Sequence, residues 1–394
     1  MDALERAREV SAGWEERVRA SLPDKLDIFD AHTHLGHDID GMVGAYDELI
    51  GGMEQYRVSR ANMFCLDEPE RGPGFRFGND RTLEFAARSD GRLVPFVRLD
   101  LNEEPVEEAV RCLDLGARGI KLHPRAQKFL PNDERLVPVF ALAAERRVPI
   151  LIHAGRGLPP IAAGLEKLVD DHPGSQLILA HAGIADLANL AYRFSGKRGV
   201  FFDTSVWSAV DLLGLLRLVP PEQIVFASDY PYGQHPGSLL LALRVAQTVG
   251  LDERQIRDML AGNANRIADG DEPLEPSTPQ GIEALVQPLA QARIHQYLSM
   301  ALPLLFTRQQ DGFGALGLAL NATEEPNGSH HEELDQIREL LVAARDLWGS
   351  IPDTAEGDQR EATRFTADGQ FPFRLQALGV DRLKGAVLGV VERR

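Results

Sequence analysis

The feature that most constrains the fold is a regular alternation of short apolar segments and longer amphipathic segments between residues 26 and 267. The short segments have the length and composition of strands, and the longer ones, such as 133–147, place apolar residues at helical spacing. Strands that alternate with helices pair in parallel through right-handed crossovers. The candidate strands are 26–34, 58–66, 93–100, 118–123, 148–153, 176–183, 199–205 and 224–229.

Eight such strands predict a TIM barrel, because eight is the number at which a parallel sheet of this kind closes on itself. A TIM barrel takes about 250 residues, so part of this 394-residue chain must form additional structure. The alternative is an open, doubly wound sheet. That fold is disfavoured, since no glycine-rich phosphate loop follows the first predicted strand.

The composition of the chain changes after residue 270. The stretch DGDEPLEPSTPQG at residues 269–281 is rich in proline, glycine and acidic residues, which is typical of a linker. The residues beyond it predict a mainly helical C-terminal region, for which covering the barrel mouth and forming a dimer contact are both open roles. The predicted organisation is an N-terminal helix (1–25), a TIM barrel (26–270), a linker (271–281) and the C-terminal region (282–394).

Three segments carry the helical prediction for the C-terminal region. Residues 287–306 have an apolar helical pattern that Pro303 is expected to interrupt. Residues 314–322 fit either a strand or a packed helix. Residues 329–348 begin with a capping box at Ser329 and keep apolar residues at helical spacing.

Composition narrows the classes of function. The formal net charge of −17 disfavours a nucleic-acid partner, because phosphate binding needs an excess of lysine and arginine on one face. A few local arginines can still hold a small anionic substrate. The two cysteines, Cys65 and Cys112, lie in apolar or helical segments, and we expect them to be buried thiols in a reducing compartment.

Neither a signal peptide nor a membrane span is expected. The first 23 residues are charged and amphipathic, and they lack the apolar core of a signal peptide. The sequence contains no run of about 18 apolar residues. We therefore expect a cytoplasmic protein. Its expected partner is a small-molecule substrate, and whether the chain forms a homodimer is left open.

The chemistry begins with the motif DAHTHLG at residues 30–36. Alternate residues of a strand share a face, so we expect His32 and His34 to project together into the barrel, with Asp30 on the same face as a supporting partner. Two imidazoles side by side on rigid backbone favour a divalent metal. Alone the motif is weak evidence, because hydrogen bonds can also satisfy two histidines at a strand end.

Further metal-compatible residues fall at the ends of other predicted strands. His153 ends the fifth strand, His181 lies near the end of the sixth, and Asp229 ends the eighth. The carboxyl ends of barrel strands converge on one face, where active sites form. Three imidazoles and a carboxylate could hold one ion while the fourth imidazole handles protons. Asp203 and Ser205, at the end of the seventh strand, are expected as supporting partners.

Six motifs occur in a fixed order within the predicted barrel, namely DAHTHLG, GIKLHP, LIHAGRG, LILAHAG, FASDYP and GNANRI. In these motifs the chain resembles the amidohydrolase superfamily, in the branch that contains aminocarboxymuconate-semialdehyde decarboxylase, related aromatic decarboxylases and many uncharacterised hydrolases. The resemblance covers residues 26 to 267 and not the C-terminal region. It leaves the reaction open, since the branch includes C–N hydrolysis, lactone hydrolysis and non-oxidative decarboxylation.

Carried over residue by residue, the resemblance implies that His32, His34, His153 and Asp229 are metal ligands. It makes His181 the catalytic histidine that orients or deprotonates the metal-bound water, and Asp229 also accepts a proton from that water. A divalent metal lowers the pKa of bound water from about 15.7 to about 7 and polarises a substrate carbonyl. Zinc suits ligands of this kind, and manganese and iron are the alternatives.

Lys121 and His123 share a face of the fourth predicted strand and are ambiguous. Many binuclear members of the superfamily bridge two metals with a carboxylated lysine on this strand, so a second metal is one interpretation. The other is a free ammonium that pairs with Asp229 or with a substrate carboxylate. The GIKLHP context resembles the mononuclear branch and favours the second interpretation.

Arg125, Lys128 and Arg156 follow the fourth and fifth predicted strands. They are candidates for binding a substrate carboxylate at the barrel mouth, and the alternative is that they are ordinary surface charges. The remaining histidines are expected in loops or in contact with solvent. They are His37, His172, His235, His295, His330 and His331.

Together these features predict a metal-dependent hydrolase that activates water to cleave an amide, ester or lactone of a small substrate. The first alternative is a metal-dependent decarboxylase of a small aromatic or unsaturated carboxylic acid, which must hold the substrate carboxylate and an electron sink at the metal. The second is a non-catalytic barrel that serves as a binding module. The histidines and aspartate that converge at one mouth argue against this second alternative.

Overall fold

The computed structural model describes residues 9, 12–13, 16–17, 19–39, 41–206, 208–281, 289–306, 311–324 and 331–349. The chain divides into two compact units, which we describe separately. The barrel unit spans Pro23–His235 and Val245–Gly281, and the helical unit spans Met1–Leu22, Pro236–Arg244 and Ile282–Arg394. Every residue predicted as part of the site lies in the barrel unit.

Eight parallel strands form the centre of the barrel unit, as the sequence predicts. They pair in chain order, each with the next, and their side chains fill a common core. A short strand that was not predicted, β2 (Val43–Gly44), pairs antiparallel with the end of β1. The parallel strands are β1 (Ile28–His37), β3 (Val58–Cys65), β4 (Leu93–Arg98), β5 (Gly119–Leu122), β6 (Pro149–Ile152), β7 (Gln176–Leu179), β8 (Val200–Asp203) and β9 (Ile224–Val225).

The residues that follow β9 close the sheet against β1. The backbone N–H of Ala31 donates to the carbonyl of Phe226 at 2.8 Å, and that of His34 donates to Tyr230 at 2.7 Å. In the opposite direction, the N–H of Asp229 donates to the carbonyl of His32 at 3.0 Å. The prediction of a TIM barrel is therefore confirmed, and closure places Asp229 directly beside the two histidines of β1.

A β-bulge interrupts β1 immediately before the histidines. The register with β3 shifts between Asp30 and Thr33, so the simple alternation of faces does not hold across this segment. Phe29 and Ala31 belong to the core cluster inside the barrel, and His32 nevertheless also lies inside. The bulge thus turns consecutive residues toward the barrel interior. The simple prediction that Asp30 shares a face with His32 and His34 does not hold here.

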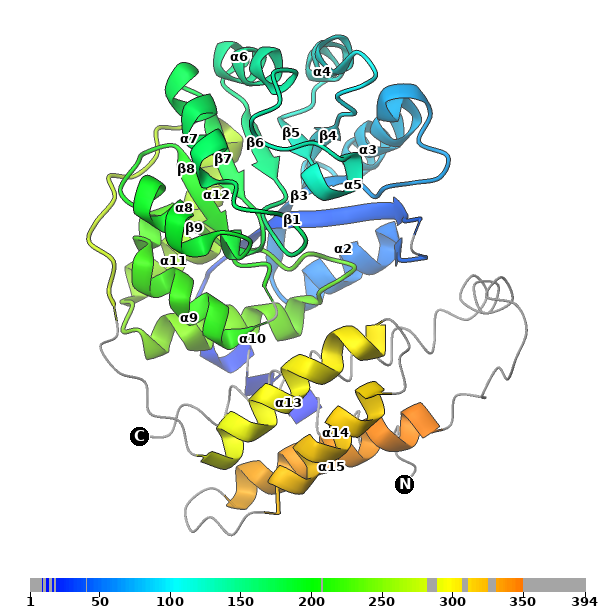
Figure 1. Cartoon of the computed structure of the whole chain (residues 1–394), viewed down its shortest axis with the longest axis vertical. Coiled ribbons are helices and arrows are strands. Elements are labelled where there is room, and N and C mark those ends of the chain that lie inside the picture. Colours follow the sequence, from blue (N-terminus) through cyan, green and yellow to red (C-terminus); the bar gives the residue numbers. More distant parts are fainter. Residues whose placement is uncertain are drawn as a thin grey trace. The chain divides into compact units, whose positions relative to one another are not determined.

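Helices surround the strands of the barrel unit (Figure 1). The predicted helix within 133–147 is confirmed as α6 (Leu136–Arg146), whose apolar residues are buried at helical spacing. The other helices of this unit are α2 (Tyr46–Gln55), α3 (Arg76–Arg88), α4 (Pro105–Asp114), α5 (Pro124–Gln127), α7 (Ala162–Asp171), α8 (Leu187–Phe194), α9 (Ala209–Leu218), α11 (Glu253–Arg257) and α12 (Asn263–Asp269). A further helix, α10 (His235–Thr248), is divided between the two units, because Pro236–Arg244 belongs to the helical unit. Single turns occur at η1 (Pro73–Phe75), η2 (His181–Gly183) and η3 (Pro221–Gln223), and η4 (Asp258–Gly262) is a π-helix.

The described part of the helical unit contains α13 (Leu289–Phe306), α14 (Asp311–Ala322) and α15 (His331–Gly349), and α14 packs against both of the others. The segment 314–322 is therefore a helix. Pro303 does not interrupt α13, which continues to Phe306. The predicted capping residue Ser329 lies outside the described residues. No helix in the described part of the chain is long and apolar enough to cross a membrane.

Candidate metal centre

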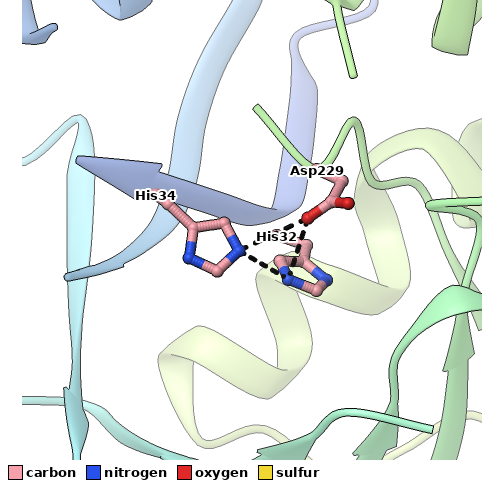
Figure 2. A group of neighbouring side chains, drawn as sticks. All are labelled: His32, His34 and Asp229. Atoms are coloured by element: carbon pink, nitrogen blue, oxygen red, sulfur yellow. Dashed lines mark hydrogen bonds and ion pairs between the residues drawn. The ribbon is translucent and has the colours of Figure 1, made fainter. Parts of the chain in front are cut away.

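Three side chains converge at the carboxyl end of the barrel (Figure 2). The Nε2 atoms of His32 and His34 are 3.1 Å apart, and each lies 3.3 Å from Oδ1 of Asp229. All three residues are buried. We call this set the metal group. Its members come from β1 and from the segment that closes the barrel, so the backbone pairing that completes the fold also assembles the set.

The protonation of His32 follows from its partners. Its Nδ1 lies 2.7 Å from Oδ2 of Asp203, and because a carboxylate only accepts, Nδ1 carries the proton and Nε2 keeps its lone pair. Burial lowers the pKa of both His32 and His34 well below the usual range, and the charge of Lys121 contributes at each ring. Both imidazoles are therefore neutral at pH 7.

The metal group is chemically suited to a divalent cation. The lone pair of His32 Nε2 faces the carboxylate of Asp229, so two acceptors lie 3.3 Å apart in a buried site. A cation among neutral imidazoles and a carboxylate replaces this repulsion with attraction. The His34 ring is held edge-on against Phe64, with centroids 4.5 Å apart, and its Nδ1 is buried with no hydrogen-bond partner in the described ranges of the chain. Packing therefore orients the His34 ring.

Asp30 supports this site in a different way from the one predicted. Its Oδ1 accepts the backbone N–H groups of His32 and Ser228, and its Oδ2 lies 3.1 Å from Nε2 of His235. These bonds tie β1 to the segment that carries Asp229. The expectation that His235 lies in solvent or a loop is wrong, because it is 3% exposed and begins α10.

Lys121 lies inside the barrel, where it is 1% exposed. Its Nζ is 3.2 Å from Nε2 of His32 and 4.5 Å from the ring centroid of Phe64. Burial lowers the pKa of Lys121 to about 7, against the opposing charges of Asp229 and Asp203. A lysine that is partly neutral at this position is compatible with both interpretations of the sequence, a carboxylated lysine that bridges two metals and a free ammonium.

A second set of imidazoles lies just beyond the ends of β5, β6 and β7. The rings of His123 and His153 stack with centroids 4.1 Å apart, and Nδ1 of His153 lies 3.0 Å from Nε2 of His181. We call these three residues the imidazole chain. His123 also caps α5, because its Nδ1 accepts the N–H of Ala126. His153 thus contacts His181, and its role as a metal ligand stays a prediction.

His181 has a defined orientation. Its Nδ1 is 2.9 Å from the carbonyl of Ser205, which only accepts, so Nδ1 carries the proton and Nε2 is the basic nitrogen. The same Nδ1 is 3.9 Å from Oδ2 of Asp229. Burial lowers the pKa of His181, and the charge of Asp203 opposes this effect. The side chain is 15% exposed, so a neutral base reaches the edge of the site.

Asp203 joins the two sets. Its Oδ2 accepts from His32, while its Oδ1 accepts the backbone N–H of His181 and the hydroxyl of Ser205 at 2.7 and 2.6 Å. It is fully buried, and the backbone of His181 adopts the left-handed conformation, with φ of 57°. Non-glycine residues rarely adopt this conformation, so the bond to Asp203 supports an unusual backbone. The prediction of Asp203 and Ser205 as supporting partners agrees with these contacts.

The predicted substrate arginines lie at the surface. Arg125 and Arg156 are both exposed, and Arg125 and Lys128 line an open cavity of about 480 Å³. The carbonyl of Arg156 is 3.5 Å from Nε2 of His153. Both predicted thiols, Cys65 and Cys112, are buried as expected.

Sequence reasoning missed Arg98. This arginine ends β4, is 1% exposed and pairs in register with Lys121. A signal was present in the sequence, because Arg98 and Asp100 are charged residues near the end of the otherwise apolar predicted strand 93–100. In a barrel, the end of a strand is where functional side chains are placed.

Comparison with known proteins gives a family match over most of the barrel. The model of the amidohydrolase family matches residues 29–267, which is more than half of the chain. Among curated proteins, none matches this sequence.

Solved structures resemble the barrel at low sequence identity. A proposed amidohydrolase from Staphylococcus aureus has 18% identity and a TM-score of 0.50, over 61% of this chain and 99% of that one. The 5-carboxyvanillate decarboxylase of Sphingomonas paucimobilis has 15% identity and a TM-score of 0.49, over 62% and 99%. A probable 2-pyrone-4,6-dicarboxylic acid hydrolase from Acinetobacter baumannii has 12% identity and a TM-score of 0.49, over 62% and 100%.

Proposed function

Since the chain belongs to the amidohydrolase family, whose members are enzymes, we propose that it is a metal-dependent hydrolase that cleaves an amide, ester or lactone of a small substrate. The observation that carries this proposal is the metal group, in which neutral nitrogens and a carboxylate oxygen converge within 3.3 Å. Residues that only support a fold have no reason to place acceptors against one another in a buried site.

His32, His34 and Asp229 would hold one divalent ion, and His153 is the proposed fourth ligand. When bound, the ion supplies a Lewis acid that polarises a carbonyl and makes water acidic enough to act as a nucleophile near neutral pH. Zinc is the proposed ion, with manganese and iron as alternatives, because imidazole and carboxylate ligands suit all three. A second ion at a carboxylated Lys121, with His123 nearby, is the binuclear alternative.

His181 is the proposed general base. Its Nε2 accepts the proton of the attacking water and then returns it to the leaving group. The carbonyl of Ser205 holds Nδ1–H and so keeps the lone pair on Nε2. Asp203 fixes the backbone on which His181 stands. The carboxylate of Asp229, 3.9 Å from the His181 ring, stabilises the imidazolium that forms and is a second proton acceptor.

Non-oxidative decarboxylation of a small carboxylic acid is the second candidate, and Lys121 favours it. A buried cation that contacts a member of the metal group can hold the carboxylate that such a substrate loses. Hydrolysis remains the first choice because His181 provides a neutral base beside the metal group, and a hydrolase needs such a base to activate water. We also propose a cytoplasmic location, for which the sequence is the only support.

One assay distinguishes the two candidates. The purified full-length protein would be offered activated esters, lactones and amides, and in parallel aromatic and unsaturated carboxylic acids. Hydrolase activity predicts acid release that a chelator abolishes and that added zinc or manganese restores. Release of carbon dioxide without hydrolysis would replace the first candidate by the second. Hydrolysis that survives complete removal of metal would contradict both.

A further inference from the structure

We infer that Arg98 binds a carboxylate group of the substrate. The inference rests on the proposed function for the identity of the site and deepens it, because it names carboxylate-bearing molecules as the substrate class. It also places the carboxylate inside the barrel and away from the exposed Arg125 and Arg156, which the sequence suggested. Four features of Arg98 carry the argument: its position, its missing partners, its free edge and its rigid support.

Arg98 projects into the barrel interior. Phe96, two residues earlier on β4, belongs to a core cluster that draws on strands around the whole barrel. Residues i and i+2 of a strand share a face, so Arg98 points to the same interior, one step nearer to the carboxyl end. Its register partner is Lys121, whose Nζ contacts His32 at 3.2 Å. Arg98 is thus on the strand next to a residue that touches the metal group.

The guanidinium of Arg98 is buried without enough partners. Its side chain is 2% exposed, and the one hydrogen bond that it makes within the described part of the chain runs from Nη1 to the carbonyl of Cys65 at 3.4 Å. Among the described residues, Nε and Nη2 have no hydrogen-bond partner, and the nearest carboxylate oxygen, Oδ1 of Asp67, is 3.8 Å from Nη2. Buried charged groups are normally paired and fully hydrogen-bonded, so this residue has an unmet need for an anion.

The two unpartnered nitrogens lie on the same edge of the guanidinium. Nε–H and Nη2–H point in nearly the same direction, and this edge binds a carboxylate through two parallel hydrogen bonds. Nη1 already contacts the carbonyl of Cys65. These two parallel donors therefore match the two oxygens of a carboxylate better than a neutral carbonyl, which offers one oxygen.

The backbone of Arg98 is held rigidly. Asn79 of α3 accepts the N–H of Arg98 at 2.9 Å and donates to its carbonyl at 3.0 Å. The amide of Asn79 also donates to Glu108 at 2.9 Å, and the Arg98 guanidinium lies over the Phe75 ring at 4.8 Å. A binding residue that is ordered before the ligand arrives loses little entropy on binding.

Electrostatics agrees with this position. Burial is the main cause that lowers the pKa of His34 and of His123, and the charge of Arg98 adds to the effect at both rings. The guanidinium is therefore within electrostatic reach of both the metal group and the imidazole chain. A carboxylate on Arg98 would leave the rest of a small substrate close to both.

Binding of benzoate and of its neutral analogue benzamide to the full-length, metal-loaded protein tests the inference without turnover. We expect the wild type to bind benzoate more tightly than benzamide. Arg98→Met should weaken benzoate binding by about 10–100-fold, the range expected for losing charged hydrogen bonds. It should leave benzamide binding within about twofold. Arg98→Lys should retain part of the preference. Arg118→Met is the matched control on an exposed arginine, and Arg125→Met tests the surface position that the sequence suggested.

The Tm provides a second readout, because replacing a purely structural arginine would lower it. Because Arg98 is buried and poorly paired, Arg98→Met should keep or raise the Tm. Asp67→Asn removes the carboxylate that lies nearest to Nη2 and should tighten benzoate binding. A lower Tm with unchanged benzoate binding would make Arg98 structural. Loss of binding in Arg125→Met alone, or a wild type with no preference for benzoate, would also overturn the inference. Metal content is measured in every variant, so failure of the proposed function is recorded separately.

Discussion

The metal group and the imidazole chain are built largely from the same residue type at the same end of the barrel, yet their ring nitrogens have different partners. In the metal group, the buried Nε2 atoms of His32 and His34 face each other and a carboxylate. In the imidazole chain, His153 and His181 form a ring-to-ring contact of 3.0 Å, and His181 reaches the edge of the site. The first arrangement suits a cation, and the second suits a mobile proton.

Asp203 explains how both arrangements coexist. Its two oxygens face different sets: Oδ2 fixes the His32 ring, and Oδ1 fixes the backbone of His181. The partner of the second ring nitrogen therefore decides the role of each histidine more than the residue type does. Variants that separate metal content from turnover test this view.

The largest expected effect is on turnover in His181→Asn. Asparagine keeps a hydrogen-bonding group but cannot accept the proton, so turnover should fall by about 10²–10⁴-fold. Metal content and Tm should match the wild type. The reaction rate with the best substrate of the panel, together with elemental analysis, measures both quantities, and His172→Asn is the control at a distant site.

Two outcomes of this experiment would contradict the separate roles of the metal group and the imidazole chain. Loss of metal from His181→Asn would make His181 a ligand and would revive the binuclear interpretation with Lys121. Near-normal turnover would remove His181 from the mechanism and leave Asp229 as the proton acceptor.

An intermediate effect is expected on metal affinity in Asp203→Asn. Loss of the carboxylate weakens the bond that orients His32, and supporting partners of this kind typically contribute about 10–100-fold in metal affinity. Competition with a fluorescent chelator measures the change, with Asp211→Asn as the control on α9. Unchanged affinity would mean that Asp203 supports only the backbone of His181.

The smallest effect on the site is expected from removing the C-terminal region. Both sets lie in the barrel unit, so a chain that ends at Gly281 should keep its metal content within about twofold. Its Tm should fall, because Pro236–Arg244 belongs to the helical unit and its leucines are buried. We expect the barrel unit to fold without this region, and an insoluble product would contradict that expectation.

The sequence predicted the barrel well because the signal repeats along the chain. All eight strands were located to within a few residues, and strand ends then placed His32, His34 and Asp229 at one mouth. Short range patterns failed where tertiary structure overrides them. Pro303 is accommodated within α13, and the minimal strand β2 has no periodicity to detect.

The finer geometry of the site depended on contacts distant in sequence. The bulge in β1 redirects Asp30 toward Ser228 and His235, which lie about two hundred residues away. Alternation along one strand cannot reveal such partners. Arg98 is a similar case, since its importance comes from donors left unpaired in the folded interior.

The central claim is that the metal group holds a divalent ion, and elemental analysis of the purified protein tests it most directly. We predict about one equivalent of zinc, manganese or iron per chain in the wild type. The His32→Ala/His34→Ala variant should contain none while its circular dichroism spectrum stays that of a folded barrel, and His153→Ala reports on the fourth ligand. A folded double variant with the metal content of the wild type would contradict the account.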